Sequence, residues 1–469
     1  MAGSISLAMI VKDEADQLLE CLRSVQGAVD EICIVDTGSR DTTMEIARAF
    51  NARTTAFIWC DDFAAARNES LRLCTKDWVF ILDADERLAP GDVARLRQLA
   101  IGPMDTCYRM TTRNFTNNTS VGEFTPSPAG DPQARGFAGW FPSTKVRLFA
   151  NRKGAKFEGK VHELVNRSLD SLGVKTANSD IPILHYPFAK SPDRVREKQE
   201  LYLRLGHDKV KSDPADAKAH SELGNQYAEV GDWMNAASAF RESLRIDPSN
   251  ALVLKDLGAA LHMLKRDEEA RQALRLALKL NPTMAEAWRN LGVVLADAKE
   301  WDGAIECFEQ GLINDANWSE GHRYLSVAIE GAGRLIDAVV ESKKALDSLP
   351  DSTECLRLYI HQMLRLERRA DARDHLLSLV AAGAKNPELH NAVGELFYYD
   401  NLFEESKNHF RLAGEGGLSP AYNNLGVVYF KQGLFAEAKD AFSQCLRLEP
   451  GHHGAQSNLE KVLRRQASS

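Results

Sequence analysis

The stretch WVFILDADE, residues 78–86, places an apolar run directly before an acidic cluster that contains Asp83 and Asp85. The run is short and rich in residues that favour strands, so we expect a buried strand ending near Leu82. Upstream, similar apolar runs at 6–11, 31–35 and 53–58 alternate with helical patterns at 14–25, 42–50 and 64–74. Such alternation predicts a mostly parallel sheet with helices on both faces.

Acidic clusters follow three of the predicted strands: KDE at 12–14, DTGSRD at 36–41 and DADE at 83–86. Ligands of such sheets bind beyond the carboxyl ends of the strands, so the three clusters would meet at one edge. Carboxylates gathered there repel one another unless a cation is bound, and a divalent metal carrying a diphosphate meets that need. The alternative is structural, because Asp pairs at strand ends often form turns or cap helices.

Composition excludes several classes of protein. The chain has 469 residues and a net charge of −8, which disfavours a nucleic-acid binder that works by neutralising phosphates. No apolar run approaches the roughly 18 residues of a membrane span, so no transmembrane segment is expected. Eight scattered cysteines without a C-x-x-C pair indicate neither a zinc knuckle nor a disulfide framework, and a cytoplasmic location is expected.

A different pattern begins at residue 217. Leu-Gly pairs at Leu223, Leu257 and Leu291 follow one another at 34-residue spacing, and the pattern returns near Val393 and Leu425. Each pair is followed by a small residue and then by a large apolar one, an arrangement that lets two antiparallel helices approach closely. The pattern resembles the tetratricopeptide (TPR) repeat, and it predicts an all-α solenoid.

Residues 1 to about 205 resemble the family 2 glycosyltransferases of the GT-A fold. The motifs that carry the resemblance are AMIVKDE (8–14), IVDTGSRDTT (34–43), AAARNESL (64–71), WVFILDADERL (78–88), KVRLFAN (145–151), FEGKVHE (157–163) and ILHYPF (183–188). The set is similar to the branch that contains lipopolysaccharide-core glucosyltransferases. The order of domains, with TPR repeats added after the glycosyltransferase domain, is similar to that of bacterial peptide S-glycosyltransferases.

The resemblance implies roles for residues that follow the predicted strands. Asp36 would contact the nucleoside, with uridine expected, in a pocket that Val11 and Glu14 also line. Arg67, in the AARN motif, would lie near the donor, and Asp83 would contact its ribose or sugar.

The resemblance also implies a metal site. Asp85 would bind the metal, Mn²⁺ or Mg²⁺, and His185 in the ILHY motif would add a metal or diphosphate contact. The alternative for His185 is a packing histidine beside Tyr186.

The catalytic base is less clearly marked. The family inverts the anomeric centre, and many members carry an acidic residue four positions before the arginine of a motif such as VRLF. Here that arginine is Arg147 and the position holds Ser143, so Glu163 is the replacement candidate for the base, with His162 beside it. The alternative is that Glu163 pairs with a basic residue such as Arg147 or Lys160.

We therefore expect an α/β GT-A domain with a Rossmann-like, mostly parallel sheet, followed by an all-α TPR solenoid. The expected limits are 1–190 for the GT-A domain, 191–216 for a helical connector, 217–452 for seven repeats, and 453–469 for a capping helix and tail. Within the first domain, the polar segment between Thr111 and Trp140 is expected to be an acceptor loop that closes over the donor, or else a passive surface insertion.

The expected function is transfer of a sugar from a nucleotide-diphosphate sugar, a UDP-sugar first, to a protein or peptide acceptor recruited by the repeats. One alternative keeps the chemistry and changes the acceptor to lipopolysaccharide core or another surface glycan. The other is a non-catalytic TPR scaffold. TPR arrays often self-associate, so a second copy of this chain, forming a homodimer, is a further possible partner.

Overall fold

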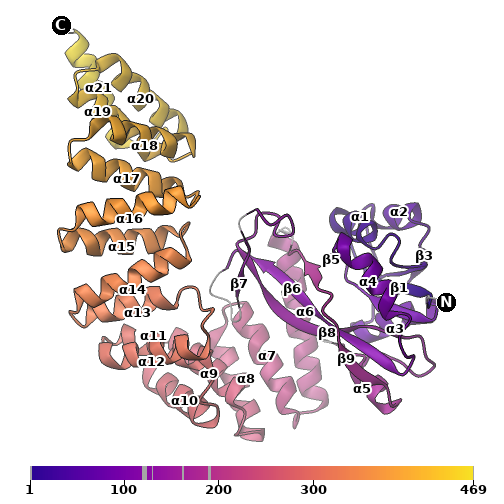
Figure 1. Cartoon of the computed structure of the whole chain (residues 1–469). Helices are drawn as coiled ribbons and strands as arrows, with labels where there is room; N and C mark the ends of the chain where they lie inside the picture. Colours follow the sequence, from indigo (N-terminus) through magenta and orange to yellow (C-terminus); the bar gives the residue numbers. More distant parts are fainter. Residues whose placement is uncertain (1–2, 119–123, 129, 161–162, 188–191, 468–469) are drawn as a thin grey trace. The chain divides into compact units, whose positions relative to one another are not determined.

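The computed structural model describes residues 3–118, 124–128, 130–160, 163–187 and 192–467 (Figure 1). The chain divides into two compact units. The N-terminal unit comprises Met1–Asn290 with Asp315–Trp318, and the C-terminal unit comprises Leu291–Asn314 with Ser319–Ser469. These units follow spatial contacts, so the domain limits expected from the sequence remain predictions.

A mixed sheet forms the centre of the N-terminal unit. Its strands lie in the order β3 (Arg53–Ala56), β2 (Glu31–Asp36), β1 (Ile5–Val11), β4 (Trp78–Ile81), β8 (Gly139–Ala150), β6 (Thr106–Thr116), β10 (Ile183–His185), β5 (Glu86–Leu88). The short strands β7 (Thr125–Pro126) and β9 (Lys175–Asn178) pair with β8 and β6. The first four strands are parallel, as predicted. Beyond them β8 runs antiparallel to both of its neighbours, so the second half of the sheet is mixed.

Helices cover both faces of the sheet. The N-terminal helices are α1 (Ala15–Ser24), α2 (Thr43–Ala49), α3 (Phe63–Leu73), α4 (Val93–Leu99) and α5 (Asn166–Ser171). Successive side chains of a strand point to opposite faces, and β1 shows the consequence. Leu7 shares a core with Leu18 of α1, whereas Ala8 shares another core with Ala64 of α3.

The second half of the sheet corrects one expectation about the polar segment 111–140. Residues up to Thr116 belong to β6, and β8 begins at Gly139, so both ends of the segment are strand rather than loop. The two strands pair in register from Thr116 opposite Gly139 to Tyr108 opposite Leu148, with one irregularity beside Arg109. Backbone pairing along these long strands outweighs the low strand propensity of their Asn and Gly residues.

The rest of the described chain is helical. After α6 (Pro192–Ser212) come α7 (Ala217–Glu229), α8 (Trp233–Ile246), α9 (Ala251–Met263), α10 (Asp267–Leu280), α11 (Ala285–Asp297), α12 (Trp301–Asn314), α13 (Gly321–Gly331), α14 (Leu335–Ser348), α15 (Thr353–Arg365), α16 (Arg369–Ala381), α17 (Pro387–Tyr399), α18 (Phe403–Glu415), α19 (Ser419–Lys431), α20 (Phe435–Leu448) and α21 (His453–Ala467). None of the described helices has an apolar stretch long enough to cross a membrane.

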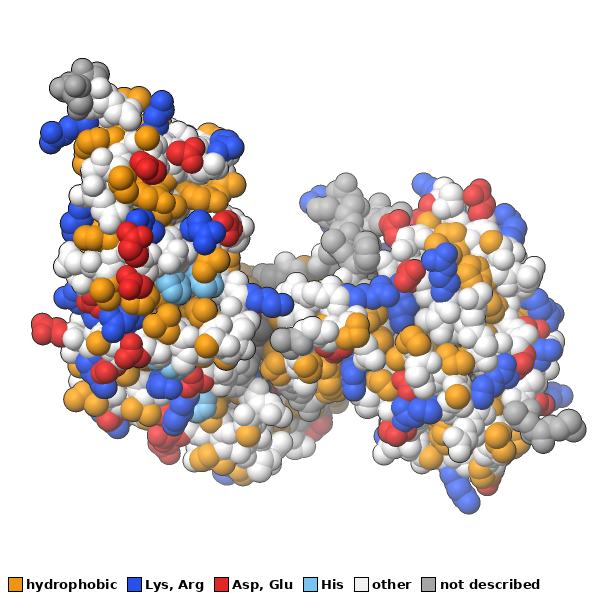
Figure 2. Space-filling model, turned by 45° about the horizontal axis from the view of Figure 1, so that its top comes forward, with side chains coloured by type: hydrophobic (Ala, Val, Ile, Leu, Met, Phe, Trp, Pro, Cys, Tyr) orange, Lys and Arg blue, Asp and Glu red, His pale blue; other side chains and the backbone are white. Residues whose placement is uncertain are grey.

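Glycines set the spacing within the helical hairpins, as the repeat pattern predicts. A Cβ atom added to Gly426 of α19 would lie 2.5 Å from the Phe442 ring of α20, and Gly394 faces Phe410 in the same way. The two helices of each hairpin therefore approach at a distance that only a residue without a side chain allows. On the face seen in Figure 2, charged side chains of both signs alternate with small hydrophobic groups over the helical array.

Candidate active site

The loops that follow β1 and β2 are joined at the carboxyl edge of the sheet. The two strands are in register with Val11 opposite Asp36. Beyond them, the backbone N–H of Asp13 donates to Ser39 Oγ at 2.9 Å, and the N–H of Arg40 donates to Asp13 Oδ1 at 2.6 Å. The structure thus brings Val11 and Asp36, two of the predicted donor-binding residues, side by side.

Glu14 lies at the same corner. Its carbonyl accepts the first backbone hydrogen bonds of α1, and its N–H donates to Thr43 Oγ1 at 2.8 Å. Asp36 is partly exposed, and its Oδ1 accepts from the N–H of Ser39 at 3.0 Å. By contrast, Asp41 accepts from the N–H of Thr43 at 3.0 Å and acts as a local turn and cap residue.

Arg67 joins two acidic residues from distant parts of the chain. It lies on α3, whose first turn is capped by Asp62 accepting from the N–H of Ala65 at 2.9 Å. Arg67 is only 7% exposed; its Nε donates to Glu163 Oε1 at 3.1 Å and its Nη2 donates to Asp83 Oδ1. Glu163 therefore pairs with a basic residue, as the structural alternative expected, but the residue that donates to it is Arg67 rather than one of the two named examples, Arg147 and Lys160.

Electrostatic interactions favour the charged forms of Asp83 and Arg67. Burial raises the pKa of Asp83, but the positive charges of Arg67, Arg147 and Lys145 together outweigh burial and hold that pKa well below its usual range. Burial opposes the charge of Arg67, yet Asp83 and Glu163 raise its pKa above the usual value. Arg67 Nη1 is buried and has no hydrogen-bond partner among the described residues, so the side chain retains a donor for a ligand.

Asp85 and His185 face each other across neighbouring strands. His185 pairs with Glu86 in the antiparallel β10–β5 ladder, and the N–H of Tyr186 donates to the carbonyl of Asp85 at 3.1 Å. These contacts place His185 Nε2 3.4 Å from Asp85 Oδ2, with both side chains about one-quarter exposed. Burial lowers the pKa of His185, but the carboxylates of Asp85, Glu86 and Asp83 together outweigh burial and raise it.

Glu86, the last acid of DADE, has a structural role. Its carboxylate receives two bonds from Arg147, at 2.8 Å from Nη1 and 2.5 Å from Nη2, and a third from the N–H of Asp83 at 2.9 Å. Both side chains are nearly inaccessible, and burial raises the pKa of Glu86. The Glu86–Arg147 pair therefore locks the turn that presents Asp83 and Asp85.

Two residues at the site were missed by the sequence reasoning. Asn114 on β6 contacts His185, with its Oδ1 2.9 Å from Nδ1 of the ring. Lys145 on β8 is exposed, and its charge helps to lower the pKa of Asp83. Lys145 is the first residue of the quoted KVRLFAN motif, and the antiparallel pairing of β8 with β4, the strand before the acidic turn, brings the two regions together.

Part of the expected acceptor loop is anchored. Tyr186 stacks on Phe115 with ring centroids 5.0 Å apart, and its hydroxyl donates to the carbonyl of Gln133 at 2.8 Å. Trp140 packs against the same small core, with the Arg113 guanidinium 4.9 Å from its ring centroid. Residues 119–123 and 129 of this segment, and His162 beside Glu163, lie outside the described residues, so closure of the loop remains a prediction.

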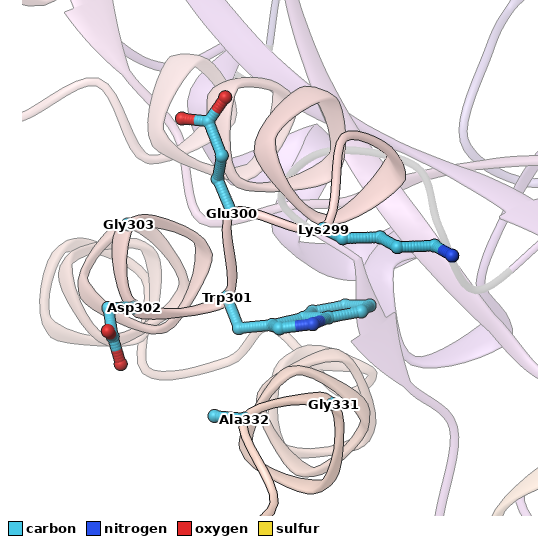
Figure 3. A pocket seen from close by; sticks show the side chains of 7 residues that line it. All are labelled: Lys299, Glu300, Trp301, Asp302, Gly303, Gly331 and Ala332. Atoms are coloured by element: carbon cyan, nitrogen blue, oxygen red, sulfur yellow. The ribbon is translucent and has the colours of Figure 1, made fainter.

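A cavity of about 520 Å³ lies elsewhere, in the C-terminal unit, between the turn before α12 and the end of α13. Its wall is Trp301, whose ring packs against Gly331 so closely that an added Cβ there would lie 2.6 Å away. Figure 3 shows the Glu300 and Asp302 side chains pointing apart, with Lys299 extended beside the ring. Without convergent polar groups, this cavity is a feature of repeat packing rather than a reaction site.

Comparison with known families agrees with this division of the chain. Residues 6–145 match the glycosyl transferase family 2 domain, and residues 221–285, 285–318 and 419–452 match tetratricopeptide repeats. The chain thus carries a family 2 glycosyltransferase domain followed by TPR repeats.

Individual relatives match parts of the chain. A TPR repeat-containing protein of Synechococcus elongatus is 33% identical over 257 residues, which cover 52% of this chain and 57% of that protein. The SPbeta prophage-derived glycosyltransferase SunS of Bacillus subtilis is 23% identical over 217 residues, which cover 46% and 47%. The chain therefore spans about half the length of these curated relatives. Among solved structures, the crystal structure of MamA is 27% identical, covers 35% of this chain and 96% of that one, and has a TM-score of 0.32.

Proposed function

We propose that this protein is a metal-dependent inverting glycosyltransferase that transfers a sugar from a nucleoside diphosphate sugar, first of all a UDP-sugar, to a protein or peptide acceptor. The observation that carries the proposal is the gathering of Arg67, Asp83, Asp85 and His185 at the carboxyl edge of the sheet, within a family 2 glycosyltransferase domain. The adjoining TPR repeats support a protein or peptide as the acceptor, because such repeats commonly present grooves for peptides.

The donor would occupy the edge of the sheet from β2 to β5. Val11, Glu14 and Asp36 would hold the nucleoside at the corner formed by the first two loops. Asp83 would contact the ribose or sugar, and the buried Nη1 of Arg67 supplies a donor for an anionic oxygen.

The residues present fit a divalent cation. Asp85 Oδ2 and His185 Nε2 lie 3.4 Å apart. A carboxylate oxygen suits Mn²⁺ or Mg²⁺, and the imidazole nitrogen favours Mn²⁺, the softer of the two. No group of three or more His, Cys, Asp or Glu side chains within the described part of the chain is arranged to hold a metal. Such ions usually take only one or two protein ligands and complete their shell with phosphate oxygens and water. A bound metal would neutralise charge on the departing diphosphate.

Glu163 is our candidate for the general base. In an inverting transfer the acceptor attacks the anomeric carbon, the bond to the diphosphate oxygen breaks with its electron pair, and a base takes the acceptor proton. Glu163 is 15% exposed on its side chain and is linked through Arg67 to Asp83, and this link supports a position beside the donor. Arg67 would orient the Glu163 carboxylate through the hydrogen bond from its Nε.

Asp85→Asn tests the proposal. The full-length protein would be incubated with radiolabelled nucleotide sugars and Mn²⁺, and both donor hydrolysis and transfer would be measured. We expect the variant to lose at least about a hundredfold in rate, because it loses a charged ligand. Asp105→Asn is the matched control, since Asp105 makes only a loose 3.8 Å ion pair with Lys175.

Two outcomes would count against the proposal. Wild-type activity in Asp85→Asn would refute the assignment of the site. No turnover of any donor by the wild type, together with no thermal shift by UDP and Mn²⁺, would leave the non-catalytic scaffold. The acceptor itself is best sought by mass spectrometry of the products of neighbouring genes after incubation with an active donor.

A further inference from the structure

Asn114 lies behind His185, on the side away from Asp85. In the parallel β6–β10 ladder His185 is directly opposite Asn114, and in the β6–β8 ladder Asn114 is opposite Phe141. The side-chain oxygen of Asn114 lies 2.9 Å from Nδ1 of the His185 ring. The order Asn114, His185, Asp85 therefore crosses three adjacent segments of the sheet.

The orientation of the Asn114 amide follows from its other contacts. Its Nδ2 donates to the carbonyl of Phe141 at 3.1 Å and to Ser143 Oγ at 3.1 Å. A carbonyl oxygen can only accept, so the group facing Phe141 must be the NH₂ and the group facing His185 must be the oxygen.

This orientation decides the tautomer of His185. Because Asn114 Oδ1 can only accept, Nδ1 of the ring must carry the hydrogen. In the neutral ring, Nε2 then keeps its lone pair, and Nε2 is the atom that faces Asp85 Oδ2 at 3.4 Å. Two acceptors at this distance repel each other, and either a proton on Nε2 or a cation between or beside the two atoms relieves the repulsion.

We propose that Asn114 is a positioning residue: it holds His185 in the Nδ1–H tautomer and aims Nε2, beside Asp85, at the divalent cation of the reaction. The inference rests on the proposed function and concerns Asn114, a residue to which the resemblance assigns no role. Partners of this kind behind a metal-binding histidine typically affect metal affinity by about 10- to 100-fold.

A purely structural role for Asn114 makes a different prediction. If Asn114 mattered only because it ties β6 to β8, removing its contact with Ser143 would have the same consequence as removing the whole amide. Ser143→Ala removes one donor contact but leaves Oδ1 facing His185. Asn114→Leu has a similar volume and removes every polar contact of the side chain.

The experiment uses the full-length protein with Mn²⁺ and UDP. Pulsed electron paramagnetic resonance reports ¹⁴N coupling from an imidazole bound to Mn²⁺, and titration gives the Mn²⁺ affinity. We expect coupling in the wild type, its loss in His185→Ala, and a reduced signal with at least tenfold weaker affinity in Asn114→Leu. In Ser143→Ala and in the exposed control Asn178→Ala on β9, the ¹⁴N signal and the Mn²⁺ affinity should both stay within about threefold of the wild-type values.

Circular dichroism would establish that each variant is folded, with Asn114→Ala as the replacement if Asn114→Leu is not. Unchanged coupling and affinity in a folded Asn114 variant would overturn this inference and leave the proposed function intact. Equal losses in Ser143→Ala and Asn114→Leu would also overturn it, in favour of strand packing. Absence of nitrogen coupling in the wild type would instead refute His185 as a ligand, and with it the metal part of the proposed function.

Discussion

At the scale of single residues, the candidate site is organised by arginines that each satisfy acidic groups far away in the chain. Arg67 contacts Asp83, 16 residues away, and Glu163, 96 residues away, while Arg147 neutralises Glu86 across 61 residues. This division separates Glu86, which holds the turn together, from Asp83 and Asp85, which belong to the proposed ligand site. Without Arg147, Glu86 would be left as a buried, uncompensated charge beside Asp83 and Asp85.

Glu163→Gln should lower kcat by about 10²- to 10⁴-fold with a hydroxyl acceptor, because the amide cannot take a proton. UDP affinity should change little, since the amide oxygen can still accept from Arg67 Nε. The loss should be smaller with a thiol acceptor, whose own pKa is near 8.5. Steady-state kinetics on both acceptor types checks this, with Glu158→Gln as the control. A variant that turns over hydroxyl acceptors at the wild-type rate would exclude Glu163 as the base.

Glu31 at the opposite edge of the sheet predicts a dependence of stability on pH. Burial raises the pKa of Glu31, but hydrogen bonds from Ser6, Arg53 and Thr75 outweigh it and lower the pKa to about 2, from 4.5 in the unfolded chain. A depressed pKa contributes stability above pH 4.5, and this contribution is lost as the pH falls from 4.5 towards 2.

We therefore expect Glu31→Gln to reduce the free energy of unfolding at pH 7 by about 2 kcal/mol, and the difference from wild type to shrink below pH 4.5. Urea unfolding between pH 7 and pH 3 measures this, with the exposed Glu45→Gln as the control. A difference that stays constant across that range would contradict the assignment of the stabilisation to the Glu31 charge.

At the scale of elements, close packing between neighbouring helices and between a helix and a loop determines the geometry. Within the hairpins, glycine on one helix faces a buried ring on the next. In the N-terminal unit, α6 contacts the loop before α3: Arg204 makes two bonds to Asp61, at 2.6 and 2.8 Å, and Tyr202 lies 5.9 Å from Phe63 between ring centroids. The loop that leads to Arg67 is thus braced by the first long helix after the sheet.

Gly426→Ala should destabilise the protein by about 1–3 kcal/mol, because the new Cβ would lie 2.5 Å from a Phe442 ring that has no space to move. This result would run against the intrinsic preference of helices for alanine over glycine, which is about 1 kcal/mol. Thermal or urea unfolding measures it. Gly451→Ala, with no atom within 4 Å of its added Cβ, should not destabilise, and equal effects of the two changes would rule out overpacking.

Arg204→Ala should loosen the loop before α3. Asp61 has a φ of 60°, a left-handed conformation that costs energy for a residue with a side chain, and Arg204 and Trp59 both bond its carboxylate. We expect amide hydrogen exchange at residues 57–62 to rise several-fold in the variant while β1 is unaffected. The control is Arg196→Ala, an exposed position on the same helix. Unchanged exchange would show that the loop holds its conformation without α6.

At the scale of the whole molecule, the chain forms two compact units with separate hydrophobic cores. Both units contain arginine–carboxylate pairs, such as Arg147 with Glu86 in the first and Arg373 with Asp400 in the second. In the C-terminal unit, His390 and His409 are partly buried, with their Nδ1 atoms 3.1 Å apart. This histidine pair should make the stability of the C-terminal unit sensitive to mild acid.

Burial lowers the pKa of His390 and of His409, and their mutual proximity lowers that of His409 further. A lowered histidine pKa means that the unfolded chain binds more protons below pH 6.5, so stability should fall as the pH drops from 7.5 to 5.5. The double variant His390→Gln with His409→Gln should show a smaller fall in Tm over that range. The exposed His361→Gln on α15 is the control, and identical pH dependence of all three proteins would contradict the prediction.

The two-part architecture, the helices on both faces of the sheet and the acidic edge were all predictable from the sequence. They depend on local periodicity, because apolar residues at spacings of two, of three to four, or of 34 report directly on strands, helices and repeated hairpins. The parallel order of β1 to β4 followed from the same alternation. The roles of the site residues remain predictions that the proposed experiments address.

Only the tertiary structure decided which side chains meet. Arg67 rather than Arg147 contacts Glu163, Glu86 takes Arg147, and Asn114 reaches His185 from a segment expected to be a loop. These pairings depend on which strands become neighbours and in what register, and the mixed order β8, β6, β10, β5 joins segments up to about one hundred residues apart. Local spacing carries no information about such neighbours, because register is set by the combined packing and hydrogen bonding of the whole sheet.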